Sequence, residues 1–237
     1  MTSLTPFAEL HASDLFVMPN AFDAGSAKRL AEAGYPAIAT TSHGHAATLG
    51  KPDLEVTRDE LVAHVALLTS VVDVPVNVDS ADCFPREEGG VARTVELLAE
   101  AGASGLSIED YDPVTQAIVS WDEAVARVAT VVEVAHAHGI VVTARCESVL
   151  YGLGEDPIER LAAYRDAGAE VLFAPLVNDE AGIAAIVALG APVNFLAAGD
   201  HPSVARLREL GVRRVSTGGA LTTAAYDAAV AYAQALT

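Results

Sequence analysis

Cysteine, methionine and aromatic residues are scarce in this chain. Its 237 residues include two cysteines, two methionines and one tryptophan, and aromatic residues make up 5% of the sequence. Cys83 and Cys146 lie far apart and lack the short spacing of zinc ligands, so we expect neither a disulfide framework nor a zinc site. Because alanine, valine and leucine dominate instead, the predicted core consists of many small contacts rather than a few aromatic clusters.

Basic residues are also few. The chain has 14 Lys and Arg residues against 32 Asp and Glu residues, which gives a formal net charge of −18. Such a charge repels nucleic acid and anionic membranes, and no basic stripe offsets it. We therefore expect no nucleic-acid partner and no membrane partner.

Long hydrophobic runs are absent as well. No uninterrupted apolar stretch reaches the ~20 residues of a membrane span, and residues 1–14 contain no basic region followed by an apolar run. The sequence therefore predicts a cytoplasmic protein. Its length fits one large domain, so we expect residues 1–237 to form a single domain.

What the sequence does contain is a repeated order of helix, glycine and strand. Glycine is expected just after a helix because it adopts positive φ without a steric penalty. Thr57 with Glu60 has the spacing of a capping box, and Asp156 precedes a proline at the first position of a helix. Six Ala-rich amphipathic segments end at glycines that an apolar run follows, namely Gly34, Gly102, Gly139, Gly168, Gly190 and Gly211.

Eight apolar runs complete this pattern. Their near-continuous hydrophobicity is typical of parallel strands covered by helices, whereas a strand with one exposed face would alternate. An open doubly wound sheet could use the same alternation, but no Gly-x-Gly-x-x-Gly follows the first run. We predict an α/β fold, a single (β/α)8 TIM barrel, with strands in 15–21, 37–42, 75–80, 105–110, 141–147, 171–176, 193–198 and 214–219.

Polar residues interrupt these runs at their C-terminal ends, where (β/α)8 barrels carry their active sites. They are Ser42 and His43 on the second run, Asp79 and Asp82 on the third, Glu109 and Asp110 on the fourth, and Arg145 and Glu147 on the fifth. Carboxylates that meet beside a guanidinium suit Mg²⁺, with Arg145 gripping a substrate carboxylate through two parallel hydrogen bonds. The alternative is that Arg145 only forms salt bridges with Glu109 and Glu147. The implied ligand is a small, oxygen-rich anion.

Short strings distributed along the chain are distinctive as a set. They are Met18-Pro-Asn-Ala-Phe-Asp-Ala-Gly-Ser26, Ala39-Thr-Thr-Ser42, Gly50-Lys-Pro-Asp53, Pro75-Val-Asn-Val-Asp79, Ile108-Glu-Asp110, Ala144-Arg145 and Val215-Ser-Thr-Gly218. In their order and spacing, from about Met18 to about Leu221, they resemble the phosphoenolpyruvate mutase/isocitrate lyase superfamily, in its phosphonomutase-like branch.

The resemblance implies a reaction on a 2-oxo acid or its enolate that depends on Mg²⁺, or on Mn²⁺ in its place. In such a site the metal and backbone amides near Ser42 stabilise negative charge on an enolate oxygen, which makes Ser42 and Gly44 candidates for substrate binding. By position, Asp79 and Glu109 match metal carboxylates, Arg145 matches the clamp on the substrate carboxylate, and Asp53 matches an acidic residue on the loop after the second strand.

The sequence departs from the superfamily in two places. Ala81 replaces the second acid of the usual Asp-x-Asp or Asp-x-Glu, and Asp82, one position later, is the third metal candidate even though strand alternation would turn it away from Asp79. The Lys-Lys-Cys-Gly-His loop of the lyases and the Lys-bearing loop of the mutases have no counterpart in 110–120. Isocitrate lyase and phosphoenolpyruvate mutase activities themselves are therefore not expected.

Histidines after the second strand are candidates for the missing acid–base group. His43 and His45 flank Gly44, and a neutral imidazole beside the substrate is suited to proton transfer. We predict that His43 is catalytic and favour it over His45; the alternative is that both are bystanders. Gly218 and Gly219 end the eighth run, where barrels bind phosphate through backbone amides or simply turn into a helix.

These features favour a Mg²⁺-dependent lyase or decarboxylase that breaks a C–C bond of a small 2-oxo or malate-like acid through a metal-stabilised enolate. One alternative is P–C chemistry on phosphonopyruvate, as a mutase or hydrolase. Another is a barrel that binds a dicarboxylate without turnover, Ala81 marking a decayed metal site. The resemblance also implies a homo-oligomer, a dimer or tetramer, although the chain ends at Thr237, soon after the eighth unit, and leaves exchange of the last helix open.

Overall fold

The computed structural model describes residues 5–154 and 156–236. Eight short parallel strands form its centre, and each lies inside one of the apolar runs of the sequence. Near-continuous hydrophobicity is required there because helices cover the outer face of every strand. The strands are β1 Phe16–Met18, β2 Ile38–Ala39, β3 Val76–Asp79, β4 Gly105–Glu109, β7 Val141–Arg145, β8 Val171–Phe173, β9 Val193–Leu196 and β10 Arg214–Ser216.

The strands close into a barrel. Hydrogen-bonded neighbours run in the order β1-β10-β9-β8-β7-β4-β3-β2. The two ends of this order meet where Asn20, just after β1, bridges Ala39 of β2. There the Ala21 amide donates to the Ala39 carbonyl at 2.7 Å, and the Ala39 amide donates to the Pro19 carbonyl at 3.0 Å. The predicted (β/α)8 barrel is confirmed, and the open sheet is excluded.

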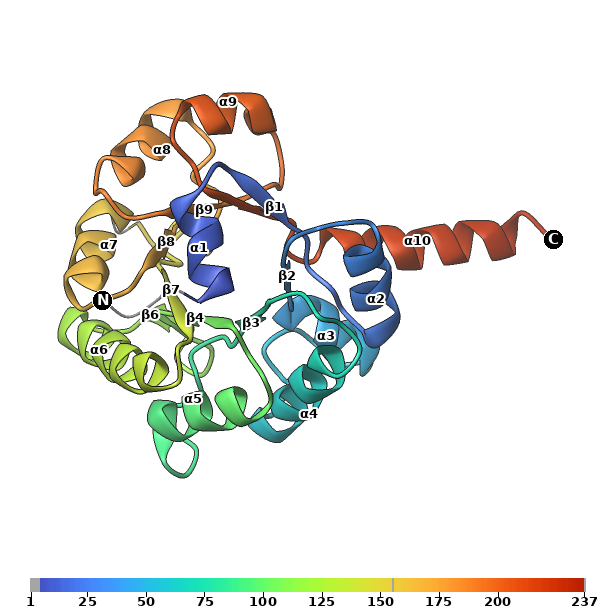
Figure 1. Cartoon of the computed structure of the whole chain (residues 1–237), viewed down its shortest axis with the longest axis horizontal. Helices are drawn as coiled ribbons and strands as arrows, with labels where there is room; N and C mark the ends of the chain where they lie inside the picture. The colour runs from blue at the N-terminus through green and yellow to red at the C-terminus, as the bar shows by residue number, and fades with distance from the viewer. Residues whose placement is uncertain (1–4, 155, 237) are drawn as a thin grey trace.

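Helices alternate with the strands, and most of them form a ring around the barrel (Figure 1). They are α1 Pro6–Ala12, α2 Ala24–Glu32, α3 Ser42–Thr48, α4 Arg58–Thr69, α5 Gly90–Glu100, α6 Trp121–Ala137, α7 Pro157–Asp166, α8 Glu180–Val187, α9 Val204–Glu209 and α10 Ala220–Gln234. A small antiparallel hairpin, β5 Tyr111–Asp112 with β6 Ala117–Ile118, follows β4. Across the described residues, no helix has the length and apolar character needed to cross a membrane.

The predicted starts and ends of the helices are confirmed. Thr57 and Glu60 form a reciprocal capping box at the start of α4, and Asp156 accepts a hydrogen bond from the Ile158 amide at the start of α7. All six predicted glycines have positive φ, between 69° and 105°. The local signals for helix boundaries are therefore read correctly from the sequence.

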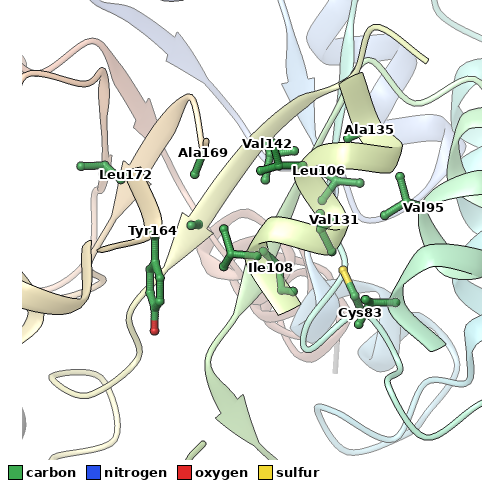
Figure 2. Close-up of a cluster of buried hydrophobic side chains, with 14 of the residues drawn as sticks. Cys83, Val95, Leu106, Ile108, Val131, Ala135, Val142, Tyr164, Ala169 and Leu172 are labelled. Atoms are coloured by element: carbon green, nitrogen blue, oxygen red, sulfur yellow. The ribbon is translucent and has the colours of Figure 1, made fainter. Parts of the chain in front are cut away.

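The main core fills the layer between the strands and the helices. Figure 2 shows Leu106 of β4 and Val142 of β7 against Val131 and Ala135 of α6, and all four residues are buried. Successive side chains of a strand point to opposite faces, so the residues between these apolar ones point into the barrel. This alternation places Glu109 and Arg145, at the last positions of β4 and β7, on the inner face.

One end of the barrel is plugged. Phe7 of α1 packs with Phe16, Val141 and Val171 near the starts of the strands. A Cβ atom on Gly105, the first residue of β4, would lie 2.4 Å from the Phe7 ring. Figure 1 shows α1 across the centre of the ring. A ligand must therefore enter from the opposite end, where the strands finish.

Helix α10 extends away from the ring (Figure 1). Of its fifteen residues only Thr222 is buried, and its apolar side chains are exposed. Tyr226 is 42%, Val230 57% and Tyr232 73% exposed. Exposed apolar surfaces of this kind are common at protein–protein interaction sites.

Candidate active site

Arg145 stands at the centre of a carboxylate cluster at the open mouth. Its Nε and Nη2 atoms donate to the two carboxylate oxygens of Glu147, at 2.7 and 3.3 Å. Its Nη1 atom lies 2.9 Å from both Asp79 Oδ1 and Glu109 Oε1. The guanidinium also lies over the Phe173 ring, 4.9 Å from its centroid. Arg145 therefore contacts three carboxylates and one aromatic ring. The salt bridges with Glu109 and Glu147, which the sequence offered as the alternative to substrate binding, are present.

Three adjacent strands bring these residues together. Glu109 and Arg145 are paired neighbours at the ends of β4 and β7, and Asp79 ends β3 beside Ser107 of β4. The other oxygen of Asp79, Oδ2, accepts a hydrogen bond from the Ser42 amide at 2.9 Å. The predicted meeting of Asp79, Glu109 and Arg145 at one rim is therefore observed, with Ser42 beside them.

Negative charge exceeds positive charge in this cluster. Burial raises the pKa of Glu109 well above its usual value, and it also raises the pKa of Glu147. Burial acts to lower the pKa of Arg145, but the surrounding carboxylates more than reverse this, and its pKa is raised. Burial, followed by repulsion from Asp79, raises the pKa of Asp53. An added cation, or a proton on one of these acids, would therefore bring the cluster closer to electrical balance.

His43 and Asp53 form a pair at the rim. His43 Nδ1 lies 3.7 Å from Asp53 Oδ2, and both side chains are about half exposed. The His43 ring is held against Gly219, where an added Cβ would lie 2.5 Å from a ring carbon. Glycine at this position therefore leaves the space that the imidazole occupies.

A cavity of about 240 Å³ fills the mouth. Its rim carries Ser42, His43, Asp53, Asp79 and Arg145. Its floor, deeper in the barrel, is lined by Asn77, Ser107, Asn194, Arg214 and Ser216, and Asn20 lines it where the strands end. The volume suits a small molecule, and the polar walls suit an anion with several oxygens.

Three other sequence candidates lie outside this cavity. Asp82 lies beyond the end of β3, so strand alternation does not set its direction; its carboxylate accepts a hydrogen bond from the Phe84 amide and lies 3.7 Å from Arg86. Gly44 is buried in α3, its amide donates to Thr41 Oγ1, and an added Cβ would lie 2.4 Å from Thr222 Oγ1. His45 is buried and its ring stacks on that of His64 at 3.8 Å. The contacts of Gly44 are therefore packing contacts between α3 and α10.

Two residues that line the cavity, Asn20 and Arg214, are missing from the sequence-based site. Asn20 Oδ1 accepts hydrogen bonds from the Thr217 and Gly218 amides, each at 2.9 Å, so the Gly218 amide is already engaged. Arg214 lies inside the barrel, although it opens an apolar run. A polar residue inside a strand that should be wholly apolar is the signal that could have found both.

The donor set can be tested against Mg²⁺. Within the ranges that the structure describes, no three His, Cys, Asp or Glu side chains are grouped closely enough to enclose an ion. Mg²⁺, however, commonly binds one or two carboxylates and keeps several waters. Asp79 and Glu109 meet at a single guanidinium nitrogen, and the cluster carries excess negative charge. Their chemistry therefore fits a Mg²⁺ ion bound by two carboxylates and largely through water.

An acidic rim with one arginine thus lies at the C-terminal mouth of a (β/α)8 barrel, the end at which such barrels carry their active sites. The family model for phosphoenolpyruvate phosphomutase matches residues 7–237. The chain belongs to the phosphoenolpyruvate mutase/isocitrate lyase superfamily, as the strings in its sequence indicate.

Similar proteins include enzymes of C–C bond cleavage. A lyase/mutase-type protein of Burkholderia cenocepacia J2315 has a TM-score of 0.92 and 44% identity, over 97% of this chain and 86% of that one. An oxaloacetate decarboxylase of Paraburkholderia xenovorans is 33% identical, over 89% of this chain and 73% of its own. An oxaloacetate acetylhydrolase in complex with its product oxalate has a TM-score of 0.80 and 28% identity, over 91% and 79% of the two chains.

Proposed function

We propose that this protein is a Mg²⁺-dependent C–C lyase or decarboxylase acting on a small 2-oxo or malate-like carboxylic acid. The observation that carries the proposal is the meeting of Asp79, Glu109 and Arg145 at the open mouth of the barrel. The relatives that act on oxaloacetate support this class of substrate. The polar cavity beside the cluster is of a size for such an acid.

Asp79 and Glu109 are the residues that would hold Mg²⁺, and Asp53 adds negative charge from the loop after β2. The ion, when bound, supplies Lewis-acid stabilisation of the charge that develops on a substrate oxygen. Arg145 binds and orients a substrate carboxylate. Its Nη1 atom, which Asp79 and Glu109 share, is the donor proposed for this contact, in exchange for one of those two carboxylates.

His43 is the proposed acid–base residue, oriented by Asp53. With a proton on Nδ1, the side that faces Asp53, the ring leaves Nε2 to accept or return a proton in the cavity. In the proposed reaction the C–C bond breaks and its electron pair stays with one fragment as an enolate. For a malate-like acid, His43 Nε2 first takes the proton of the substrate hydroxyl, which becomes the carbonyl of the other fragment, and then returns this proton to the enolate carbon. For a decarboxylation, CO2 is the other fragment, and the proton that reaches the enolate through His43 comes from water.

A second candidate function is binding of a dicarboxylate without turnover. The observation in its favour is that Arg145 is already paired with three carboxylates, while Asp82 lies apart from Asp79. The two functions differ in their need for metal. An enzyme requires Mg²⁺ or Mn²⁺ for turnover, whereas a binding protein keeps its affinity for the acid in the presence of a chelator.

The test is a screen of 2-oxo acids, malyl acids and phosphonopyruvate with Mg²⁺, followed by release of pyruvate or the corresponding 2-oxo acid. We expect turnover of a C–C substrate, its loss in excess chelator, and at least a ~100-fold loss in Arg145→Ala. Equal rates for Arg145→Ala and wild type would remove the clamp, and equal rates in chelator would remove the metal. Turnover of phosphonopyruvate alone would replace the proposal by P–C chemistry.

The exposed face of α10 supports a homo-oligomer, a dimer or tetramer, in which this helix packs on another subunit. Tyr226, Val230 and Tyr232 form the apolar part of that face. We further propose that the protein is cytoplasmic, and that residues 1–237 make up one catalytic domain. Cooperative unfolding in a single transition is the expected result for one domain.

A further inference from the structure

Arg214 is a buried cation without a carboxylate partner. Its side chain is 2% exposed. The Nε atom donates to Asn194 Oδ1 at 2.7 Å, Nη2 donates to Thr143 Oγ1 at 3.0 Å, and Nη1 lies 3.2 Å from His11 Nε2. Burial lowers the pKa of His11 to about 3, so that ring is neutral at physiological pH. Among the residues that the structure describes, no Asp or Glu oxygen lies within 4.0 Å of this guanidinium.

The position of Arg214 relates it to the proposed active site. Thr143, which accepts its hydrogen bond, lies two residues before Arg145 on the same inner face of β7. Two residues of a strand span about 7 Å, so the two guanidinium groups occupy successive layers of the barrel interior. Both arginines line the same cavity, Arg145 at the rim and Arg214 at the floor.

The charges around the cavity show why a second cation matters. Three acids, Asp79, Glu109 and Glu147, contact Arg145, and a fourth, Asp53, lies near Asp79 at the rim. All three nitrogens of the Arg145 guanidinium are already engaged. Even a bound divalent cation would leave one negative charge in excess if all four were ionised. An anionic substrate would then be repelled, because charges interact strongly at short range in a poorly solvated cavity. Arg214 is a cation in this cavity that no Asp or Glu among the described residues neutralises.

We propose that Arg214, with Asn194 and Thr143 holding its guanidinium, is a second anion-binding determinant that receives or attracts a carboxylate group deep in the barrel. The substrate is accordingly a dicarboxylate, with one carboxylate near Arg145 and the other toward Arg214. This inference rests on the proposed function for the class of ligand. A purely structural role, in which Arg214 only anchors α1 through His11, is the competing explanation.

The experiment is calorimetric titration of oxalate, a dianion, into the full chain with Mg²⁺. Arg214→Gln should weaken oxalate binding about 10- to 100-fold, which corresponds to loss of a charged hydrogen-bonding partner. Arg214→Lys, which keeps the charge, should recover most of that loss. His11→Phe removes the contact with α1, and Arg208→Gln, in α9, removes one positive charge elsewhere; both should bind oxalate within about twofold of wild type.

Oxalate binding in Arg214→Gln equal to that of wild type would overturn the proposal. So would an equal loss in His11→Phe, because the effect would then come from the anchored helix. Should Arg214→Gln fail to fold, the arginine Nε–H resonances of the wild-type protein provide the test. Oxalate must shift the resonance of Arg214 while leaving that of Arg58, in α4 outside the barrel, unchanged; an unshifted Arg214 refutes the role.

This test is separate from that of the proposed function. Oxalate binding that depends on Arg214, in a protein that turns over none of the screened acids, upholds the subsite and rejects the enzyme. Turnover with oxalate binding independent of Arg214 does the reverse.

Discussion

Replacement of Arg145 by alanine tests the electrostatics of the carboxylate cluster independently of catalysis. Three acids contact this guanidinium, and the side chains of Glu109 and Glu147 are 5% and 0% exposed. Removal of one partner from a buried ion pair typically costs about 3–5 kcal/mol, since the remaining charge is left without compensation. We expect a loss of that order in the free energy of unfolding at pH 8, measured by urea denaturation.

The pH dependence makes the prediction sharper. The folded-state pKa values of Glu109 and Glu147 are already raised by burial, and loss of Arg145 raises them further. A carboxyl whose pKa is raised on folding stabilises the protein below its unfolded pKa, and this contribution disappears as the pH rises through the folded value. Arg145→Ala should therefore be closer to wild type at pH 5.5 than at pH 8.

The control is Arg145→Lys, which keeps a charge but not the two-point contact with Glu147, and it should lose less stability than Arg145→Ala. A loss below about 1 kcal/mol in Arg145→Ala, or a loss that does not change with pH, would show that the acids do not depend on this guanidinium.

Three further predictions concern packing, titration and assembly. Gly44→Ala should destabilise the protein by about 1–3 kcal/mol in thermal denaturation, because its Cβ would lie 2.4 Å from Thr222 Oγ1; an unchanged midpoint would refute the packing role. Burial lowers the pKa of His11 and of His64 to about 3, so stability should be complete above about pH 6.5 and fall below it. Each histidine should lower the free energy of unfolding by about 1.4 kcal/mol by pH 5.5, measured in urea titrations. In His64→Phe the contribution of one histidine to this loss should disappear. Tyr232→Glu should shift the mass measured by light scattering toward a monomer, whereas an unchanged mass would place the contact elsewhere.

Local sequence signals predict the fold well because each acts over a few residues. The capping box of Thr57 and Glu60 and the glycines after the helices depend on backbone geometry within one turn. The eight strands lie inside the eight apolar runs because a strand covered on both faces has little freedom in composition. Because the same unit repeats eight times, the main feature that the sequence leaves undecided is whether the sheet closes into a barrel.

The candidate site was only partly predictable. Asp79, Glu109 and Arg145 could be brought together because each ends a strand, and all parallel strands finish at one rim. The contacts of Gly44 and Asp82 could not be read from position, since they depend on Thr222 of α10 and on Arg86 in the loop after β3. Asn20 belongs to one of the sequence strings that resemble the superfamily. Its role could not be predicted, because its side-chain amide links the segment after β1 to the segment after β10.

The sequence by itself determined the eight alternating units, the ends of the helices and the three residues that meet at the rim, because hydrophobic period and glycine position act locally. Only the tertiary structure decided which charges are compensated. Among the described residues Arg145 is surrounded by acids and Arg214 is not, although both stand inside apolar runs. Apart from Glu147, the partners of each come from other segments of the chain, which meet only when the barrel closes.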